Sequence, residues 1–271
     1  MRGKEEHGKV KMTDSGLVIP ALTVIVGQAC TLKCKHCANF SPFAPDSVKR
    51  YPLEQLCGNL QVIFQSVHRL EKVQVQGGEP FLYTQLPELL DFIRASGKVD
   101  LLTVATNGTI VPDARVLQAM QRNQVRVRIS NYTSTSAETV IQLTEQLKEY
   151  GLDIWIYEFA SDDSMWYDMG GITEAPETAG EDALQQRFMN CPFHDCFTLE
   201  NGKISRCGRA VMAGLLQGFT AREQDLLPVA ASEDFALKLW RYLDLPAYME
   251  ACRYCYGTER GKVLPAQQLE A

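Results

Sequence analysis

Three cysteines near the start of the chain have the spacing of metal ligands. Cys30, Cys34 and Cys37 form a C-x3-C-x2-C pattern. Three thiolates in one short loop can hold three irons of a [4Fe-4S] cube, and the fourth iron is then left to bind another molecule. A zinc loop is the alternative, and it would need a fourth ligand such as His36 or His68 to complete a tetrahedron.

A second group of thiols lies in the last third of the chain. Its proposed ligands are Cys191, Cys207, Cys252 and Cys255. Four thiolates make a closed site, which can hold either an iron-sulfur cluster or a structural zinc ion. A hairpin over residues 197–206, with a type I′ turn at Asn201-Gly202, would bring the first two of these thiols together. Of the two remaining cysteines, Cys57 falls on the apolar face of a predicted helix and is expected in the core.

The elements that must position these thiols alternate along the chain. Apolar, β-branched runs predict strands at 22–26, 73–76, 101–106, 125–130 and 152–158. Helical patterns fall between them, near 52–68, 86–96, 113–122 and 136–150. Strand and helix alternation with short connections predicts an α/β domain with a parallel sheet.

The chain divides into three predicted parts. Residues 1–16 are polar and lack periodicity, so they are expected to be a flexible leader. Residues 17–180 form the α/β domain, and residues 159–180, rich in acid, Gly and Thr, are expected to be a long loop or lid. Residues 181–271 form a small cysteine-rich domain.

A second motif follows the second predicted strand and reads Gly77-Gly78-Glu79-Pro80. With the cysteine triad, including His36 before its last cysteine, it resembles the radical S-adenosylmethionine (SAM) superfamily. The resemblance implies a partial (β/α)6 barrel whose open iron binds SAM. SAM would be cleaved to methionine and a 5′-deoxyadenosyl radical that removes a hydrogen atom from substrate. The implied SAM-binding residues are His36, Gly77, Gly78, Glu79, Pro80, Asn107, Ser130 and Asn131.

The C-terminal thiols carry a further resemblance. The run C-x10-G-x4-C from Cys191 to Cys207 is similar to the start of the SPASM or shortened Twitch extension of many radical SAM enzymes. The resemblance implies one auxiliary [4Fe-4S] cluster. The spacing from Cys207 through Cys252 and Cys255 is similar to that of 2-deoxy-scyllo-inosamine dehydrogenase.

These resemblances imply oxidation (dehydrogenation) or epimerisation of a carbohydrate-like small molecule. In radical SAM epimerases a free thiol returns a hydrogen atom to the substrate, and Cys196 is the candidate here, with a structural or alternative ligand role as the other interpretation. Tyr157, Glu158 and residues 159–180 are candidates for substrate contact. A flavodoxin or ferredoxin type of protein would supply the electron. The alternatives are a maturase acting on a ribosomally made peptide and a non-catalytic iron-sulfur or zinc scaffold.

Composition restricts the partners. The net charge is −6 and the pI is near 5.4, whereas binding to nucleic acid or to an anionic membrane needs a basic surface. The sequence contains no run of about 18 apolar residues and no apolar signal segment. We therefore expect a cytoplasmic protein with no nucleic-acid or membrane partner.

Overall fold

The computed structural model describes residues 9–132, 136–159, 165–173, 175–176 and 178–270. Its centre is a parallel sheet with the strand order β3-β4-β5-β6-β7. The strands are β3 (Leu22–Ile25), β4 (Arg69–Gln76), β5 (Val99–Thr106), β6 (Arg126–Asn131) and β7 (Asp153–Glu158). The helices between them are α1 (Leu53–Ser66), α2 (Leu86–Ala95), α3 (Ala114–Arg122) and α4 (Ala137–Glu149). The predicted α/β alternation is therefore confirmed.

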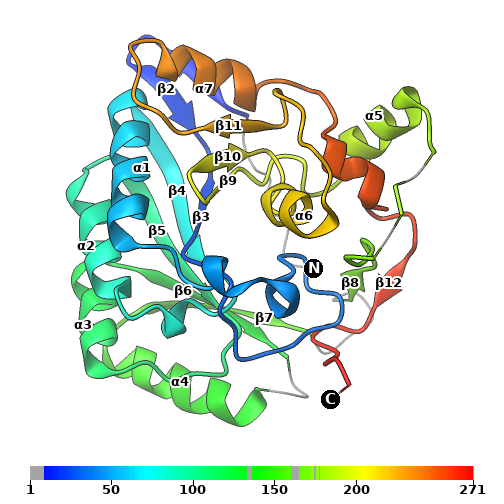
Figure 1. Cartoon of the computed structure of the whole chain (residues 1–271). Helices are drawn as coiled ribbons and strands as arrows, with labels where there is room; N and C mark the ends of the chain where they lie inside the picture. The colour runs from blue at the N-terminus through cyan, green and yellow to red at the C-terminus, as the bar shows by residue number, and fades with distance from the viewer. Residues whose placement is uncertain (1–8, 133–135, 160–164, 174, 177, 271) are drawn as a thin grey trace.

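The strands are two-faced, and this decides where the helices pack. In β4, Val73 and Val75 are fully buried, whereas Lys72, Gln74 and Gln76 on the alternate face are only partly buried. Successive strand residues point to opposite faces, so one face of the sheet is apolar and the other is polar. Helices α1 to α4 lie along the outer side of the curved sheet, as Figure 1 shows.

The predicted hairpin is present and extends the same sheet. Strands β9 (Thr198–Glu200) and β10 (Lys203–Ser205) pair antiparallel. Positive φ angles of 48° at Asn201 and 72° at Gly202 match the expected type I′ turn. Strand β9 pairs parallel with β3, and β11 (Leu226–Pro228) extends the edge. The sheet thus runs across residue 180, and the division into domains there stays a prediction.

The N-terminal segment differs from the expected flexible leader. Residues 1–8 lie outside the described part of the chain, but β1 (Lys11–Thr13) pairs antiparallel with β2 (Gly16–Ile19). The Thr13 hydroxyl donates to the Gly16 carbonyl at 2.9 Å, and Gly16 has a φ of 116°. The turn joins an exposed strand, β1, to β2, whose Leu17 and Ile19 side chains are buried in the core.

The remaining helices lie in the connections after β3 and β4 and in the C-terminal part of the chain. They are α5 (Glu181–Asn190), α6 (Ala210–Gln217), α7 (Phe235–Leu243), and the 3-10 helices η1 (Ser41–Phe43), η2 (Asp46–Val48), η3 (Pro80–Leu82) and η5 (Glu250–Tyr254). Within residues 159–180, the predicted loop or lid, β8 (Trp166–Tyr167) pairs antiparallel with β12 (Lys262–Val263). Among the residues described, no helix is long and apolar enough to cross a membrane.

Candidate active site

A cavity of about 550 Å³ lies between the polar face of the sheet and the C-terminal elements. This volume is in the range of small-molecule sites. Seven thiols from both ends of the chain line it: Cys30, Cys34, Cys37, Cys191, Cys196, Cys207 and Cys255. The fold therefore brings the two predicted thiol groups to one cavity.

The triad loop is held by the backbone of the Gly-Gly-Glu-Pro segment. The Gly78 N–H donates to the Gly27 carbonyl at 3.0 Å, and the Glu79 N–H donates to the Ala29 carbonyl at 2.7 Å. A Cβ added to Gly77 would stand 2.2 Å from the Gly27 oxygen, and one on Gly78 would stand 2.3 Å from the Ala29 oxygen. Both glycines line the cavity, and their lack of a side chain lets the two loops touch.

The Glu79 carboxylate does not line this cavity. It is 2% exposed and accepts hydrogen bonds from the N–H groups of Phe81 and Asn107 and from the Thr106 hydroxyl. Burial raises its pKa to about 7. Its three donors tie the end of β4 to the end of β5. Pro80 begins η3 and is likewise outside the cavity lining.

Two of the three predicted polar strand ends reach the cavity. The Asn107 amide donates to Thr31 Oγ1 at 3.1 Å and to Cys30 Sγ at 3.5 Å, and Ser130 also lines the cavity. Asn131 does not, because the next residue of a strand points to the other face. Its amide donates to Glu158 at 2.8 Å.

Aromatic side chains from β7 and the segment that follows it form part of the cavity lining. Tyr157 lines the cavity, as predicted for substrate contact, but Glu158 does not. From residues 159–180, the lining includes Phe159, Met165, Trp166, Tyr167 and Met169; residues 160–164, 174 and 177 lie outside the described part. His36 also lines the cavity, with Nδ1 at 3.5 Å from an Asp168 carboxylate oxygen.

A C-terminal segment that the sequence analysis missed supports the triad loop. Residues 267–269 run antiparallel to residues 33–35, with the Lys35 N–H donating to the Gln267 carbonyl at 2.7 Å and the Leu269 N–H to the Lys33 carbonyl at 2.8 Å. The Gln268 amide lies 3.6 Å from Cys34 Sγ. No local pattern could have signalled this contact, because the partners are more than 230 residues apart.

The four C-terminal thiols share a smaller space. Cys191, Cys207, Cys252 and Cys255 line a cavity of about 30 Å³, and Cys196 does not. Burial, followed by the neighbouring Cys207 thiol, raises the pKa of both Cys191 and Cys252 to about 12. Among the described residues, no group of three or more Cys, His, Asp or Glu side chains is arranged as the ligands of a single metal ion.

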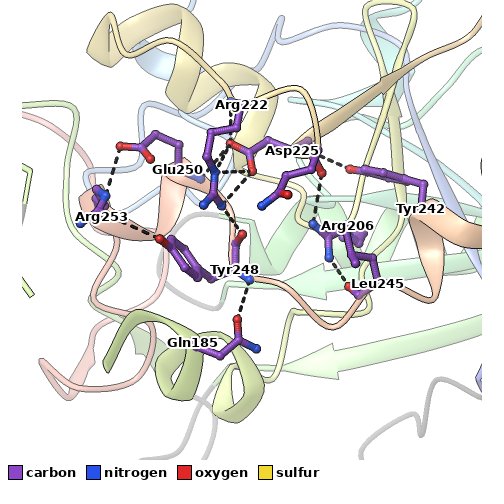
Figure 2. A network of polar contacts seen from close by, with 10 residues as sticks. Gln185, Arg206, Arg222, Asp225, Tyr242, Leu245, Tyr248, Glu250 and Arg253 are labelled. Atoms are coloured by element: carbon purple, nitrogen blue, oxygen red, sulfur yellow. Dashed lines mark hydrogen bonds and ion pairs between the residues drawn. The ribbon is translucent and has the colours of Figure 1, made fainter. Parts of the chain in front are cut away.

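An ion pair with a buried carboxylate, Asp225, positions segments that carry these thiols. Asp225 is 1% exposed and accepts from the N–H groups of Arg222 and Glu250, each at 2.9 Å, while the Arg222 guanidinium lies 3.1 Å from its carboxylate. Figure 2 shows Asp225 at the centre of this network, with Tyr242 and Arg206 on its other side. Since Glu250 begins η5 and Arg206 precedes Cys207, the network fixes both thiol-bearing segments.

Comparison with known proteins agrees with the fold. The sequence profile of the Radical SAM superfamily matches residues 24–157. A Methanocaldococcus jannaschii protein whose name describes it as a glycyl-radical enzyme activating enzyme is 26% identical over 129 residues, which is 45% of this chain and 47% of that protein. The GTP 3′,8-cyclase of Chlorobaculum tepidum is 24% identical over 109 residues, 40% of this chain and 32% of the cyclase. The matched segment spans less than half the length of either relative.

Among solved structures, native anSMEcpe with bound AdoMet superposes with a TM-score of 0.50 and 15% identity over 69% of this chain and 74% of that chain. The likeness concerns the fold alone. It agrees with the α/β, partial-barrel class expected from the sequence.

Proposed function

Because residues 24–157 belong to the radical SAM superfamily, we propose that this chain is an enzyme that cleaves SAM reductively and removes a hydrogen atom from a carbon of a small polar substrate. One observation carries the proposal: the triad thiols line a cavity of about 550 Å³ at the carboxyl ends of parallel strands. Ligands gather at that edge in α/β folds.

The residues present fit an iron-sulfur cluster. Burial raises the pKa of Cys30 to about 11 and that of Cys34 to about 12, so these thiols lose their protons only beside a strong positive charge such as bound iron. Together with Cys37 they would hold three irons. When bound, the cluster and SAM supply a one-electron cleavage that gives methionine and a hydrogen-abstracting 5′-deoxyadenosyl radical. A flavodoxin or ferredoxin type of protein would bring the electron.

The proposed SAM contacts are the residues of the predicted set that line the cavity: His36, Gly77, Gly78, Asn107 and Ser130. Asn107 also orients Cys30 through its amide. Glu79 and Pro80 do not line the cavity, and we propose an indirect role for them: they would keep the Gly77-Gly78 segment packed against the triad loop. We propose no SAM contact for Asn131, whose amide donates to Glu158.

Two fates of the substrate are proposed, and both involve thiols that line the cavity. Cys191, Cys207, Cys252 and Cys255 would hold an auxiliary [4Fe-4S] cluster able to accept an electron, which would make the reaction an oxidation. Cys196 lines the large cavity but not the smaller space of those four thiols. Its S–H could instead give a hydrogen atom to the substrate carbon, which would make the reaction an epimerisation. The thiyl radical left on Cys196 would then take one electron from the auxiliary cluster and one proton from solvent to restore the S–H.

Replacement of one triad thiol tests the central proposal. Cys34→Ala should abolish 5′-deoxyadenosine formation after anaerobic reconstitution, while circular dichroism stays unchanged. Cys57→Ala is the matched control, because Cys57 packs in α1 and does not line the cavity. It should keep full activity. SAM cleavage by the Cys34 variant would exclude the triad as the cluster site, and a wild-type chain that holds only zinc would favour the scaffold alternative.

Deuterium labelling separates the two fates. An S–H exchanges with solvent, so a reaction in D₂O that ends at Cys196 places deuterium on the product carbon. Cys196→Ala should then stop that labelling while 5′-deoxyadenosine still forms. A product that carries no solvent deuterium and has lost two electrons would discard the thiol role and favour oxidation. A peptide product would support the maturase alternative.

A further inference from the structure

The inner face of the sheet is unusually polar for parallel strands. Strands of a parallel sheet are normally apolar on both faces. Here Thr23 of β3, Lys72, Gln74 and Gln76 of β4, and Arg128 of β6 all line the cavity. The Gln74 amide donates to the Gln76 side-chain oxygen at 2.6 Å, so part of this polar surface is satisfied within the sheet. A cavity with such a lining suits a polar ligand.

Cations outnumber acids among the described residues that line the cavity. Their side chains include Lys72, Arg128 and Arg209, and the acid Asp195. Asp195 lies 3.0 Å from His194 Nε2. Since the whole chain has a net charge of −6, this lining concentrates positive charge where a ligand would bind.

Of these cations, Arg128 has the side-chain position best suited to binding an anionic ligand. Its guanidinium lies 4.6 Å over the centre of the Tyr157 ring. Among the described residues no carboxylate pairs with it, whereas Arg126, two residues earlier on β6, lies 2.6 Å from an Asp153 oxygen. Stacking on an aromatic ring holds the guanidinium fork while leaving its N–H edge available. Such a fork matches a planar or tetrahedral oxyanion with two parallel hydrogen bonds.

Its position separates this cation from the proposed SAM end of the cavity. Ser130, a proposed SAM contact, is at the carboxyl end of β6, and Arg128 is two residues deeper. At about 3.3 Å per strand residue, the separation along the strand is roughly 7 Å. A group bound by Arg128 would therefore lie deeper in the cavity than the proposed SAM contact at Ser130.

We infer that Arg128 binds an oxyanion of the substrate, a carboxylate or a phosphate, so that the substrate is an anionic small molecule. This inference rests on the proposed function for the identity of the ligand as a substrate. Tyr157 positions the guanidinium, and Lys72 adds positive charge to the same cavity lining.

Calorimetry on the anaerobically reconstituted chain tests the inference. The probes are glucose 6-phosphate and glucuronate, with neutral glucose as the reference, each titrated with SAM present at constant ionic strength. At least one anionic probe should bind ten times more tightly than glucose, and which one does so identifies the oxyanion. Arg128→Gln should weaken that binding about tenfold or more, since a charge-assisted hydrogen bond contributes about 1.5–3 kcal/mol. The Kd for SAM should change less than twofold.

Arg126→Gln is the matched control, because it removes the same charge from the same strand where the guanidinium is already paired. It should leave both affinities unchanged. Equal affinity for glucose and both anions would overturn the inference, as would an Arg128→Gln variant that loses SAM affinity but keeps anion affinity. A wild-type chain that binds the anion but never cleaves SAM would refute the proposed function and leave the oxyanion site standing.

Discussion

The two thiol regions of this chain are held in place in different ways. Main-chain contacts fix the triad loop: residues 78–79 donate to the carbonyls of residues 27 and 29, and residues 267–269 pair with residues 33–35. Side chains fix the C-terminal thiols, through Asp225 and through Arg187, which donates to the carbonyls of Cys252 and Cys255. Main-chain docking requires particular spacings and glycines, whereas a side-chain network can be built in many ways. The contacts that hold the triad loop are therefore visible in the sequence as the Gly-Gly-Glu-Pro motif, whereas the side-chain contacts that hold the C-terminal thiols leave no such local motif.

The largest effect is expected at the glycine whose added Cβ would meet both the backbone and a cysteine of the triad loop. In Gly78→Ala the new Cβ would stand 2.3 Å from the Ala29 oxygen and 2.8 Å from Cys30 Cβ. The triad loop must move, because both neighbours are backbone or the first side-chain atom. We expect loss of the SAM-cleaving cluster and a clear fall in melting temperature. Iron per chain and 5′-deoxyadenosine formation measure the first effect.

Gly58→Ala is the control for this substitution. Gly58 lies within α1 with no atom within 4 Å of an added Cβ. Alanine is favoured over glycine inside a helix by about 0.5–1 kcal/mol, so this variant should be slightly more stable and keep its iron. A Gly78→Ala chain with normal iron content and activity would show that the triad loop is not held by this contact.

The next largest effect is expected from the C-terminal network. Asp225→Ala removes the acceptor of two main-chain N–H groups and leaves the Arg222 guanidinium without its carboxylate. Leaving these N–H groups without their acceptor costs about 1–3 kcal/mol, which should appear as a lower midpoint in anaerobic urea unfolding. If each region assembles separately, iron should fall from about eight to about four per chain while 5′-deoxyadenosine formation persists.

Asp234→Ala is the comparison variant, because Asp234 pairs with Lys238 at the surface and both side chains are more than half exposed. An exposed pair contributes at most about 1 kcal/mol, so iron and stability should hardly change. Loss of SAM cleavage in a folded Asp225→Ala chain would mean that the two regions do not assemble independently.

The difference between local sequence patterns and long-range contacts explains which parts of the fold and the site could be predicted. The five strands, their helices and the triad were predictable, because hydrophobic period and cysteine spacing are local signals. The parallel pairing of β9 with β3 could not be predicted, because a strand of three residues is too short for its hydrophobic pattern to indicate which strand it pairs with. The same holds for Gln268 beside Cys34. Glu79 was expected to face SAM, but its side chain direction depends on donors from Thr106 and Asn107, which only the folded sheet brings near it.

A buried polar cluster joins the two regions. Glu200 at the end of β9 accepts from the Gln28 amide at 2.6 Å and from the Tyr51 hydroxyl at 3.3 Å, and the Ser41 hydroxyl donates to Gln28 at 2.7 Å. Gln28 is two residues before Cys30. The hairpin that leads to Cys207 is thus tied directly to the triad loop. Burial raises the pKa of Glu200 to about 7.

The smallest predicted effect concerns Glu200 and is a change in how the free energy of unfolding depends on pH. A carboxyl whose pKa is higher in the folded than in the unfolded chain holds its proton longer when folded, so its contribution to stability is complete below about pH 4.5 and is lost as the pH rises through about 7. Glu79 behaves in the same way.

The free energy of unfolding should therefore fall between pH 5.5 and 8. Glu200→Gln cannot ionise, so it should reduce that slope by about half and be more stable than wild type at pH 8. Anaerobic urea unfolding at four pH values measures both, with the exposed Glu145→Gln as a control that should retain the full slope. An unchanged slope in Glu200→Gln would mean that this carboxyl is already ionised in the folded chain at pH 5.5, held by Gln28 and Tyr51 strongly enough to offset its burial.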